Sequence, residues 1–326
     1  MRALLATGGE RLEIDSDLGW VDDLIRETAG VQLAPPVQCR ATVGVRVERD
    51  SRPFSVRGWE PVTRGAWRHG GEVVLENACT AGFDVHVATG PRAAEFTFRW
   101  RPPARDHLAA LLLRARFALL ARAVLVQYPA MWWAGGRGRA PLHASALTTG
   151  AATCLLAGPG GVGKSTLLSL ELAKGGTATS DNLCVSDGTT AWGVVEPLRV
   201  EGGTGRRMPH GRRERALPGR VAALTPDRLI VVRRGQAEAP RVGRCDAATA
   251  ERSLVTGTYM AGELRRFWAF AATLASATGA GPAHPPVAGV AAELSRRLDC
   301  IELALPRHPG PSLGDALTLL EEHECR

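Results

Sequence analysis

Lysine is nearly absent from this chain of 326 residues: among its 40 lysines and arginines, only Lys164 and Lys174 are lysines. Alanine, glycine and arginine are abundant, which indicates a coding bias that replaces lysine by arginine wherever the chemistry permits. Arginine has a wide planar fork, whereas lysine has a compact ammonium group on a flexible stem. Because Lys164 stands in a glycine-rich stretch, its retention indicates a tight anion site that arginine would not fit.

Cysteine pairs of the C-x-x-C type are lacking as well, and the seven cysteines are scattered and odd in number. This pattern argues against a disulfide framework and against a zinc site, and it is typical of a reducing cytoplasm. The cysteines are Cys39, Cys79, Cys154, Cys184, Cys245, Cys300 and Cys325.

The sequence also lacks a long uninterrupted apolar run of the kind that crosses a bilayer. Its most apolar segment, Leu108–Val126, contains Arg114, Arg116 and Arg122, which would be costly in lipid. The short apolar stretch at the N-terminus is followed at once by acidic residues, unlike a signal peptide. We therefore expect a soluble, cytoplasmic protein with no membrane partner.

Hydrophobic residues make up 45% of the chain, enough to bury a core, and the length suits one large domain or two ordinary ones. The net charge of +7 and the pI near 9.4 favour anionic ligands such as nucleotides or an acidic peptide, without choosing between them.

The first part of the chain alternates apolar and polar residues between turn residues, which predicts antiparallel strands. Asp106 has the character of a helix N-cap, and a long helix is expected from it to Tyr128. The glycine- and arginine-rich segment 133–141 then predicts a loop or hinge. The expected strands are Ala41–Val47, Glu72–Leu75, Asp84–Ala88 and Glu95–Trp100.

Beyond the hinge, strands and helices alternate, which predicts an α/β domain. We expect a β-rich N-terminal domain over residues 1–135, a candidate for substrate docking, and a catalytic domain over 136–326. The polar segment Glu201–Gly219 predicts a mobile loop. The expected strands are Leu142–Leu147, Thr153–Ala157, Thr177–Val185, Arg228–Arg233 and Cys300–Leu305, and the expected helices are Lys164–Lys174, Arg252–Ser276, Val287–Leu298 and Ser312–His323.

Residues 158–165 match the phosphate-binding pattern G-x-x-x-x-G-K-[ST] in full, between an apolar strand and a helix. Its glycines permit the positive φ angles that turn backbone N–H groups toward phosphate oxygens, and the helix adds its positive dipole end. Lys164 is expected to reach the β- and γ-phosphates, and Ser165 to ligate Mg²⁺. The nucleotide-binding residues expected are Gly158, Pro159, Gly160, Gly161, Val162, Gly163, Lys164, Ser165 and Thr166.

Three features around this loop narrow the class of nucleotide-binding protein. His143 precedes it, whereas Asp181 and Asn182 follow it at the return from helix to strand. Neither a transporter signature nor the GTPase motif N-K-x-D is found.

With these features the chain resembles the C-terminal catalytic domain of the HPr kinase/phosphorylase family over about residues 140 to 310. The shared pattern is Leu142-His143-Ala144-Ser145, the phosphate loop, Ser180-Asp181-Asn182 and a later Glu196-Pro197-Leu198-Arg199. The first 130 residues are more similar to the β-rich leader of HPr-kinase-related proteins from peptide natural-product clusters, including lasso-peptide clusters, where such proteins phosphorylate a serine of a precursor peptide.

The resemblance implies an ATP- and Mg²⁺-dependent kinase acting on a serine hydroxyl of a peptide or small protein. Asp181 would be the catalytic base, His143 would hydrogen-bond to it, and Lys164 would stabilise the transferring phosphoryl group. The implied metal-site residues are Ser165, Asn182 and Glu196. Self-association into rings is a further implication.

Two residues depart from the family pattern. Asn182 replaces the second aspartate of an S-D-D motif, so a metal-binding carboxylate becomes a neutral amide, and Mg²⁺ affinity should fall. Thr166 replaces a glutamate, which argues against phosphorylase activity.

Each candidate also has a plain structural interpretation. His143 could be a hydrogen-bonded core histidine, Asp181 a helix-cap or turn residue, Asn182 a turn residue, and Glu196 a solvated carboxylate. The arginines of 206–215 lack the interleaved aromatics of a nucleic-acid site, and a solvated loop, a nucleotide lid or a grip on an acidic peptide are the alternatives for them. For the whole chain, the alternatives are a small-metabolite kinase, a non-catalytic nucleotide-binding scaffold and, more remotely, a nucleic-acid ATPase.

Overall fold

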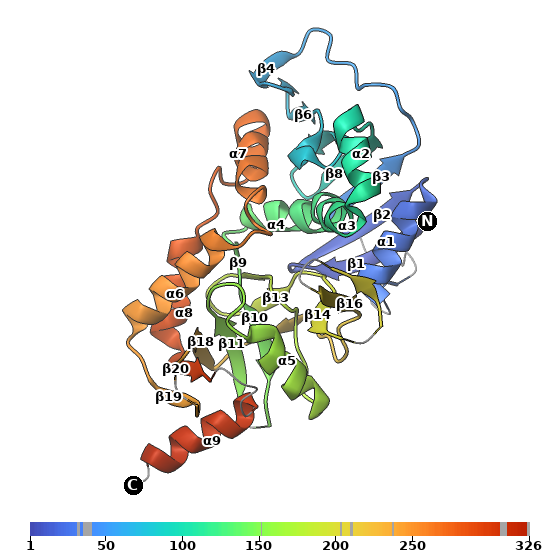
Figure 1. Cartoon of the computed structure of the whole chain (residues 1–326). Coiled ribbons are helices and arrows are strands. Elements are labelled where there is room, and N and C mark those ends of the chain that lie inside the picture. Colours follow the sequence, from blue (N-terminus) through green and yellow to red (C-terminus); the bar gives the residue numbers. More distant parts are fainter. Residues whose placement is uncertain are drawn as a thin grey trace. The chain divides into compact units, whose positions relative to one another are not determined.

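The computed structural model describes residues 1–30, 33–34, 41–150, 152–202, 204–208, 211–236, 238–306 and 312–324; Cys39 and Cys325 lie outside these ranges. The fold is mixed α/β, as the sequence predicted (Figure 1). The chain divides into two compact units. Unit 1 comprises Met1–Arg137, Thr204–Ala216 and Arg265–Pro285, and unit 2 comprises Gly138–Gly203, Leu217–Leu264 and Pro286–Arg326.

Unit 1 is built on an eight-stranded sheet in the order β1-β2-β3-β8-β7-β6-β5-β4. The strands are β1 (Arg2–Thr7), β2 (Glu10–Ser16), β3 (Val43–Glu48), β4 (Glu60–Thr63), β5 (Ala66–His69), β6 (Glu72–Leu75), β7 (Phe83–Thr89) and β8 (Ala94–Trp100). The expectation of antiparallel pairing alone was wrong, because β3 runs parallel to both β2 and β8. Helix α1 (Gly19–Ala29) supplies the crossover that a parallel β2–β3 pair requires.

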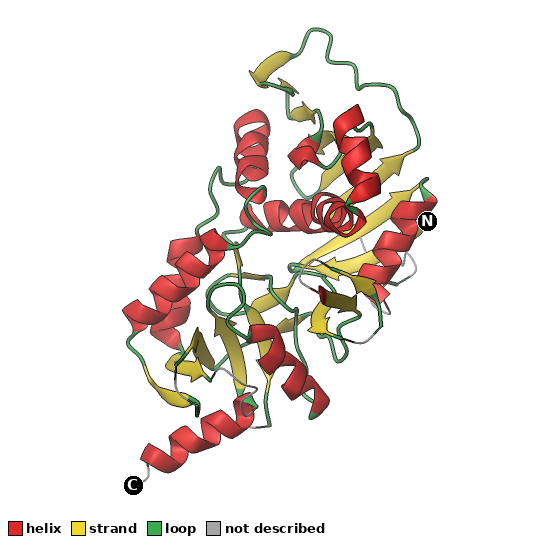
Figure 2. Cartoon of the chain, viewed as in Figure 1, coloured by secondary structure: helices red, strands yellow, loops and turns green. Residues whose placement is uncertain are grey.

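The helices of unit 1 cover this sheet, with α4 against β2 and β3 and α7 against β4, β5 and β6 (Figure 2). Besides α1 they are α2 (Ala104–Leu112), α3 (Arg114–Arg122), the π-helix η3 (Ala123–Gln127), α4 (Tyr128–Gly135), α7 (Phe267–Thr278) and the 3₁₀ turn η2 (Ala78–Thr80).

The single long helix expected from Asp106 is instead a series of shorter ones. The helical φ/ψ pattern breaks at Leu113, with φ −113° and ψ 52°. Asp106 is not the N-cap, because α2 begins at Ala104 after a proline; its carboxylate accepts a hydrogen bond from Asn77 Nδ2 at 2.7 Å. The expected loop 133–141 is shorter than predicted, since α4 continues to Gly135.

The aromatic residues near the hinge and in α7 pack in the core of unit 1. Trp132 is buried, with its ring edge-on to Phe96 at a centroid distance of 5.8 Å. Phe267 and Phe270 are also buried, and both contact the ring of Tyr128.

The arginine-rich segment was expected to be a loop, but it forms two strands, β15 (Arg206–Arg207) and β16 (Arg212–Arg215), paired antiparallel. A buried ion pair holds it in unit 1: Arg122 of α3 donates to both carboxylate oxygens of Glu214, at 3.0 and 2.9 Å. The interpretation of this segment as a solvated loop was therefore wrong at Glu214. The carboxylate of Glu214 is buried and accepts the hydrogen bonds of the buried Arg122 guanidinium.

Unit 2 contains a five-stranded sheet in the order β10-β11-β18-β20-β19 and a four-stranded sheet in the order β17-β13-β12-β9. Strands β11, β18 and β20 are mutually parallel, so their carboxyl ends share one edge. The strands of unit 2 are β9 (Ala140–Leu142), β10 (Ser145–Thr148), β11 (Thr153–Ala157), β12 (Cys184–Ser186), β13 (Ala191–Gly193), β14 (Leu198–Glu201), β17 (Ala223–Leu224), β18 (Arg228–Arg234), β19 (Arg241–Arg244) and β20 (Asp299–Leu305).

The helices of unit 2 are α5 (Lys164–Ala173), α6 (Ala247–Met260), α8 (Val287–Arg297) and α9 (Leu313–Glu324). A buried apolar cluster joins α5 and α9 to the five-stranded sheet, with Leu168, Ile230 and Leu303 fully or almost fully enclosed. No helix in the described ranges is both long and apolar enough to cross a membrane.

Several boundaries in unit 2 match the prediction and others do not. Strands β11, β18 and β20 are confirmed within one residue. The expected strand 142–147 is interrupted at His143, and 177–185 is a strand only at its end. The expected helix 252–276 is two helices, α6 and α7, since Ala261 has an extended backbone with φ −64° and ψ 120°.

Candidate functional site

The phosphate loop leaves the carboxyl end of β11 and runs into α5, the strand–loop–helix setting that phosphate binding requires. Gly158, Gly161 and Gly163 all have positive φ, at 141°, 82° and 115°. A Cβ on Gly158 would lie 2.5 Å from Val232 O of β18. Glycine is therefore required there both by the backbone conformation and by the close approach of the neighbouring strand.

The side chain of Lys164 lies inside this loop and is 4% exposed. Its ammonium group donates to the carbonyl oxygens of Gly158, at 2.7 Å, and Pro159, at 3.1 Å. Burial lowers the pKa of Lys164 to about 8, while nearby carboxylates, that of Asp181 first, oppose this shift. The loop thus holds a buried cation among neutral acceptors, where an anionic ligand would be stabilised.

His143 lies in the break between β9 and β10, and its Nε2 is 3.0 Å from Lys164 Nζ. Its backbone N–H donates to Thr258 Oγ1 of α6 at 3.0 Å. Burial, and then the charge of Lys164, lower the pKa of His143 to about 4, so the imidazole is neutral near pH 7. A neutral Nε2 accepts from the ammonium group, which places the ring proton on Nδ1.

Asp181 lies on the segment between the isolated bridge at Ala178 and β12, and it is fully buried. Its Oδ2 accepts from Asn182 Nδ2 at 3.0 Å and from the backbone N–H of Arg199 at 3.2 Å. Burial raises the pKa of Asp181, whereas the neighbouring Ser165 hydroxyl and the Arg199 amide favour the ionised form. The hydrogen bond expected from His143 to Asp181 is not among the described contacts, because His143 faces Lys164 instead.

Glu196 lies between β13 and β14 and is 2% exposed, unlike the solvated carboxylate that was one interpretation of it. Its Oε1 accepts from the backbone N–H groups of Asn182, at 2.5 Å, and Leu183, at 2.8 Å. Burial raises the pKa of Glu196 to about 7, against the opposing charge of Arg199. Glu196 therefore fixes the turn that carries Asp181 and Asn182.

No role was predicted from the sequence for Glu263 or for the side chain of Arg199. Arg199 donates from Nη1 to Glu263 Oε1 at 2.7 Å. Burial opposes the charge of Arg199, yet the carboxylates of Glu196, Glu263 and Asp181 together raise its pKa. Arg199 is thus the cation at the centre of three buried or half-buried carboxylates. The motif Glu196–Arg199 pointed to Glu196, one of the carboxylates near Arg199. No local sequence pattern links either of these residues to Glu263.

Buried polar atoms without a hydrogen-bond partner among the described residues gather at this site, and they include His143 Nδ1, Ser180 Oγ, Asp181 Oδ1 and Glu196 Oε2. Buried polar atoms are nearly always satisfied in folded proteins, so a cluster of unsatisfied ones at a phosphate loop indicates a place for a ligand, a metal ion or water. Within the described ranges, no three His, Cys, Asp or Glu side chains are grouped as a metal site.

All the predicted site residues that carry side-chain chemistry lie in unit 2, on the loops after β9 and β13, on the segment before β12 and on the first turn of α5. Comparison with protein-family models and with curated proteins found no match to the chain.

Proposed function

We propose that this chain is a kinase of the HPr-kinase type, which uses ATP and Mg²⁺ to phosphorylate a serine hydroxyl of a peptide or small protein. The observation that carries the proposal is the buried Asp181 carboxylate, with one free oxygen, in the unit that also holds a complete phosphate loop.

The donor side of the reaction rests on the phosphate loop. Its three positive-φ glycines, the start of α5 and the buried Lys164 together suit the β- and γ-phosphates of a nucleoside triphosphate. The ammonium group of Lys164 would exchange its two loop carbonyl contacts for phosphate oxygens and stabilise the charge that develops during transfer.

The acceptor side rests on Asp181. The serine oxygen would attack the γ-phosphorus, the bond from that phosphorus to the bridging oxygen would break, and ADP would leave with the bonding electrons. The hydroxyl proton would pass to Asp181 Oδ1, which no described residue occupies. The N–H donors of Asn182 and Arg199 hold the other oxygen and keep the carboxylate oriented.

The residues present fit a magnesium ion. The Ser165 hydroxyl and the free Oε2 of Glu196 are hard oxygen donors, the type Mg²⁺ prefers, and Mg²⁺ sites often use only one or two carboxylates. The amide oxygen of Asn182 accepts no described hydrogen bond and is a further donor. When bound, the ion would neutralise phosphate charge.

The test is phosphoryl transfer from ATP by the full chain, measured by mass spectrometry on candidate serine peptides and on a pool of hydroxyl metabolites. Asp181→Asn keeps the size of the side chain, and we expect it to lose about 100-fold or more in transfer rate, as removal of a general base does, while still binding ATP. Asp187→Asn, at an exposed turn, is the matched control and should keep full activity.

Undiminished transfer by Asp181→Asn would overturn the assignment of the base. Transfer to metabolites but not to peptides would replace the acceptor class. Tight ATP binding without any transfer, unchanged by Asn182→Asp, would instead establish a nucleotide-binding scaffold.

A further inference from the structure

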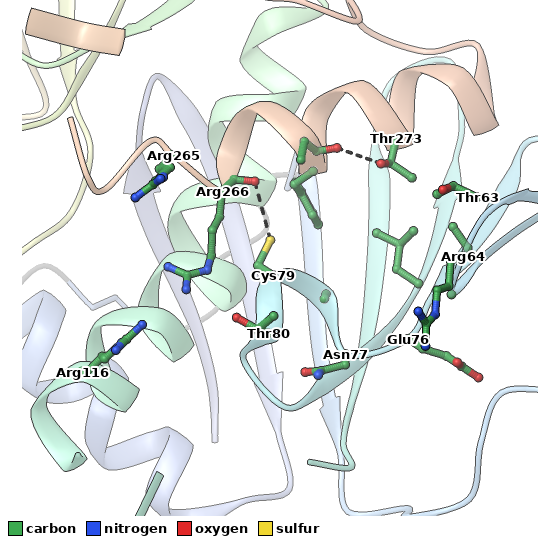
Figure 3. Close-up of a pocket in the computed structure, with 16 residues that line it drawn as sticks. Thr63, Arg64, Glu76, Asn77, Cys79, Thr80, Arg116, Arg265, Arg266 and Thr273 are labelled. Atoms are coloured by element: carbon green, nitrogen blue, oxygen red, sulfur yellow. Dashed lines mark hydrogen bonds between the residues drawn. The ribbon is translucent and has the colours of Figure 1, made fainter. Parts of the chain in front are cut away.

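Unit 1 contains a pocket of about 540 Å³ that has no part in the site described above (Figure 3). Four segments line it: the turn between β4 and β5, residues 75–80, α3, and residues 265–273 at the start of α7. All of them belong to unit 1.

The lining of the pocket is strongly basic, with four arginines against one carboxylate, that of Glu76. Arg116, Arg265 and Arg266 lie around one end, whereas Arg64 and Glu76 lie at the other (Figure 3). None of the four guanidinium groups has an ion-pair partner among the described residues. Three guanidinium groups without an ion-pair partner at one end of a pocket favour an anionic ligand, because each can donate charge-assisted hydrogen bonds to a carboxylate or phosphate.

The backbone of the lining is strained in a way found nowhere else in the described ranges. Asn77, Cys79 and Thr80 have φ of 44°, 56° and 59°, and they are the only described non-glycine residues with positive φ. Such conformations cost free energy and cluster at functional sites, the more so for a β-branched residue such as threonine.

The strained turn is held by specific hydrogen bonds, so it is a built feature. The backbone N–H of Asn77 donates to Asp84 Oδ1 at 2.9 Å, and its side-chain amide donates to Asp106 at 2.7 Å. Asn77 Oδ1 in turn accepts from the N–H of Gly82 at 2.8 Å. These bonds maintain the turn facing Arg266, whose carbonyl oxygen accepts from the Cys79 thiol (Figure 3).

Between the two charged ends the pocket is apolar, with Leu75, Ala78 and Phe270 largely buried in its floor. A lone inorganic anion would use only the three-arginine end. A peptide segment supplies carboxylates, apolar side chains and amides in one extended molecule, and so it matches both ends and the floor.

We propose that this pocket binds an acidic peptide segment, with side-chain carboxylates on Arg116, Arg265 and Arg266 and an apolar side chain on the floor. The site itself is independent of the phosphate loop; that the bound peptide is also the phosphoryl acceptor rests on the proposed function.

Fluorescence anisotropy with the full chain tests the site. The probe is a labelled short peptide of alternating glutamate and leucine, and the control probe replaces each glutamate by glutamine. Every variant carries Lys164→Ala, so that anions bound by the phosphate loop do not contribute. The double variant Arg116→Gln/Arg266→Gln should lose at least about tenfold in affinity, as expected for charge-assisted contacts.

The charge-matched control is Arg57→Gln/Arg92→Gln, which removes two exposed arginines of unit 1 outside the pocket and should change affinity less than about twofold. Ala269→Glu adds a negative charge at an exposed position in the lining and leaves every arginine in place. It should weaken binding of the acidic peptide as the pocket double variant does. Circular dichroism checks that each variant is folded.

Equal loss in both double variants, or equal binding of the glutamine peptide, would overturn the site in favour of diffuse charge attraction. Displacement of the peptide by pyrophosphate at equal molar concentration would assign the pocket to small anions instead. All these variants carry Lys164→Ala and are expected to have no kinase activity. The measured peptide affinity therefore tests the pocket separately from the proposed kinase activity.

Discussion

At the scale of single residues, the chain's two lysines occupy sharply different environments. Lys164 is buried and hydrogen-bonded to two loop carbonyls, whereas Lys174 forms a half-exposed ion pair with Asp315 at 2.9 Å. Only the first environment favours a compact ammonium group, because the buried cation lies within hydrogen-bonding distance of two loop carbonyls and of the His143 imidazole. A coding bias toward arginine therefore does not explain Lys164.

The pair supports a matched test. We expect Lys164→Arg to weaken binding of a fluorescent ATP analogue by at least about tenfold, since its planar fork cannot occupy the ammonium site. Lys174→Arg should bind the analogue as the wild type does, because an exposed ion pair tolerates either cation. Nucleotide titrations of both variants measure the difference, and equal affinity of Lys164→Arg and wild type would show that the compact group is not needed.

Glu196 makes the stability of unit 2 depend on pH. Burial raises its pKa from 4.5 to about 7, so between these values the folded chain keeps a proton that the unfolded chain has released. The contribution of Glu196 to the free energy of unfolding is therefore complete below about pH 4.5 and is lost as the pH rises through about 7, by at most about 3 kcal/mol.

Glu196→Gln keeps the acceptor for the two backbone N–H groups but cannot ionise. We expect its melting temperature to fall less than that of the wild type between pH 5 and pH 8, as measured by calorimetry. Glu238→Gln, which changes an exposed carboxyl group of the same unit, should follow the wild type. Parallel melting curves for Glu196→Gln and wild type would contradict a raised pKa.

At the scale of elements, the sequence predicted the features that depend on a single contiguous segment. The parallel strands β11, β18 and β20 are short apolar runs between breakers, and residues 158–165 are a contiguous glycine-rich motif, so the strands and the turn that leads from β11 into α5 could be predicted from the sequence. The break between α6 and α7 could not, because the apolar periodicity continues through Ala261 although the helices join different units. Likewise, the Arg199–Glu263 pair joins residues from distant segments, and no spacing rule predicts it.

The seating of the phosphate loop on β18 can be tested through its first glycine. We expect Gly158→Ala to lower the free energy of unfolding by about 1–3 kcal/mol, because its Cβ would clash with Val232 O and its φ is positive. Gly160→Ala, whose Cβ would meet nothing within 4 Å, is the control and should unfold as the wild type does. Urea unfolding measures both, and similar losses in the two variants would place the strain in the loop generally.

At the scale of the whole molecule, three separate segments of the chain make up unit 1. A division of the sequence at a single hinge predicted only the first of them and not Thr204–Ala216 or Arg265–Pro285. The segment 204–216 carries a carboxylate that unit 1 needs, since Arg122 is 2% exposed and has Glu214 as its ion-pair partner. Its Nε also donates to Thr28 Oγ1 at 2.8 Å. Composition indicated only a polar, arginine-rich stretch, because the partner that buries Glu214 lies about ninety residues earlier in the sequence.

This arrangement predicts that a substitution in the middle of the chain destabilises the N-terminal unit. Glu214→Ala leaves the buried Arg122 without its carboxylate, which should lower the free energy of unfolding by about 3–5 kcal/mol. Glu27→Ala, which removes the exposed partner of Arg206, should cost about 1 kcal/mol or less.

The two units can be followed separately because, of the eight tryptophans, only Trp192 lies in unit 2. Tryptophan fluorescence during urea unfolding therefore reports mainly on unit 1, while binding of a fluorescent ATP analogue reports on the phosphate loop. We expect Glu214→Ala to shift the fluorescence transition to lower urea and to leave nucleotide affinity in the absence of urea close to that of the wild type. A shift no larger than that of Glu27→Ala would mean that the segment 204–216 is not needed for the stability of unit 1, and that the buried pair contributes no more than an exposed one.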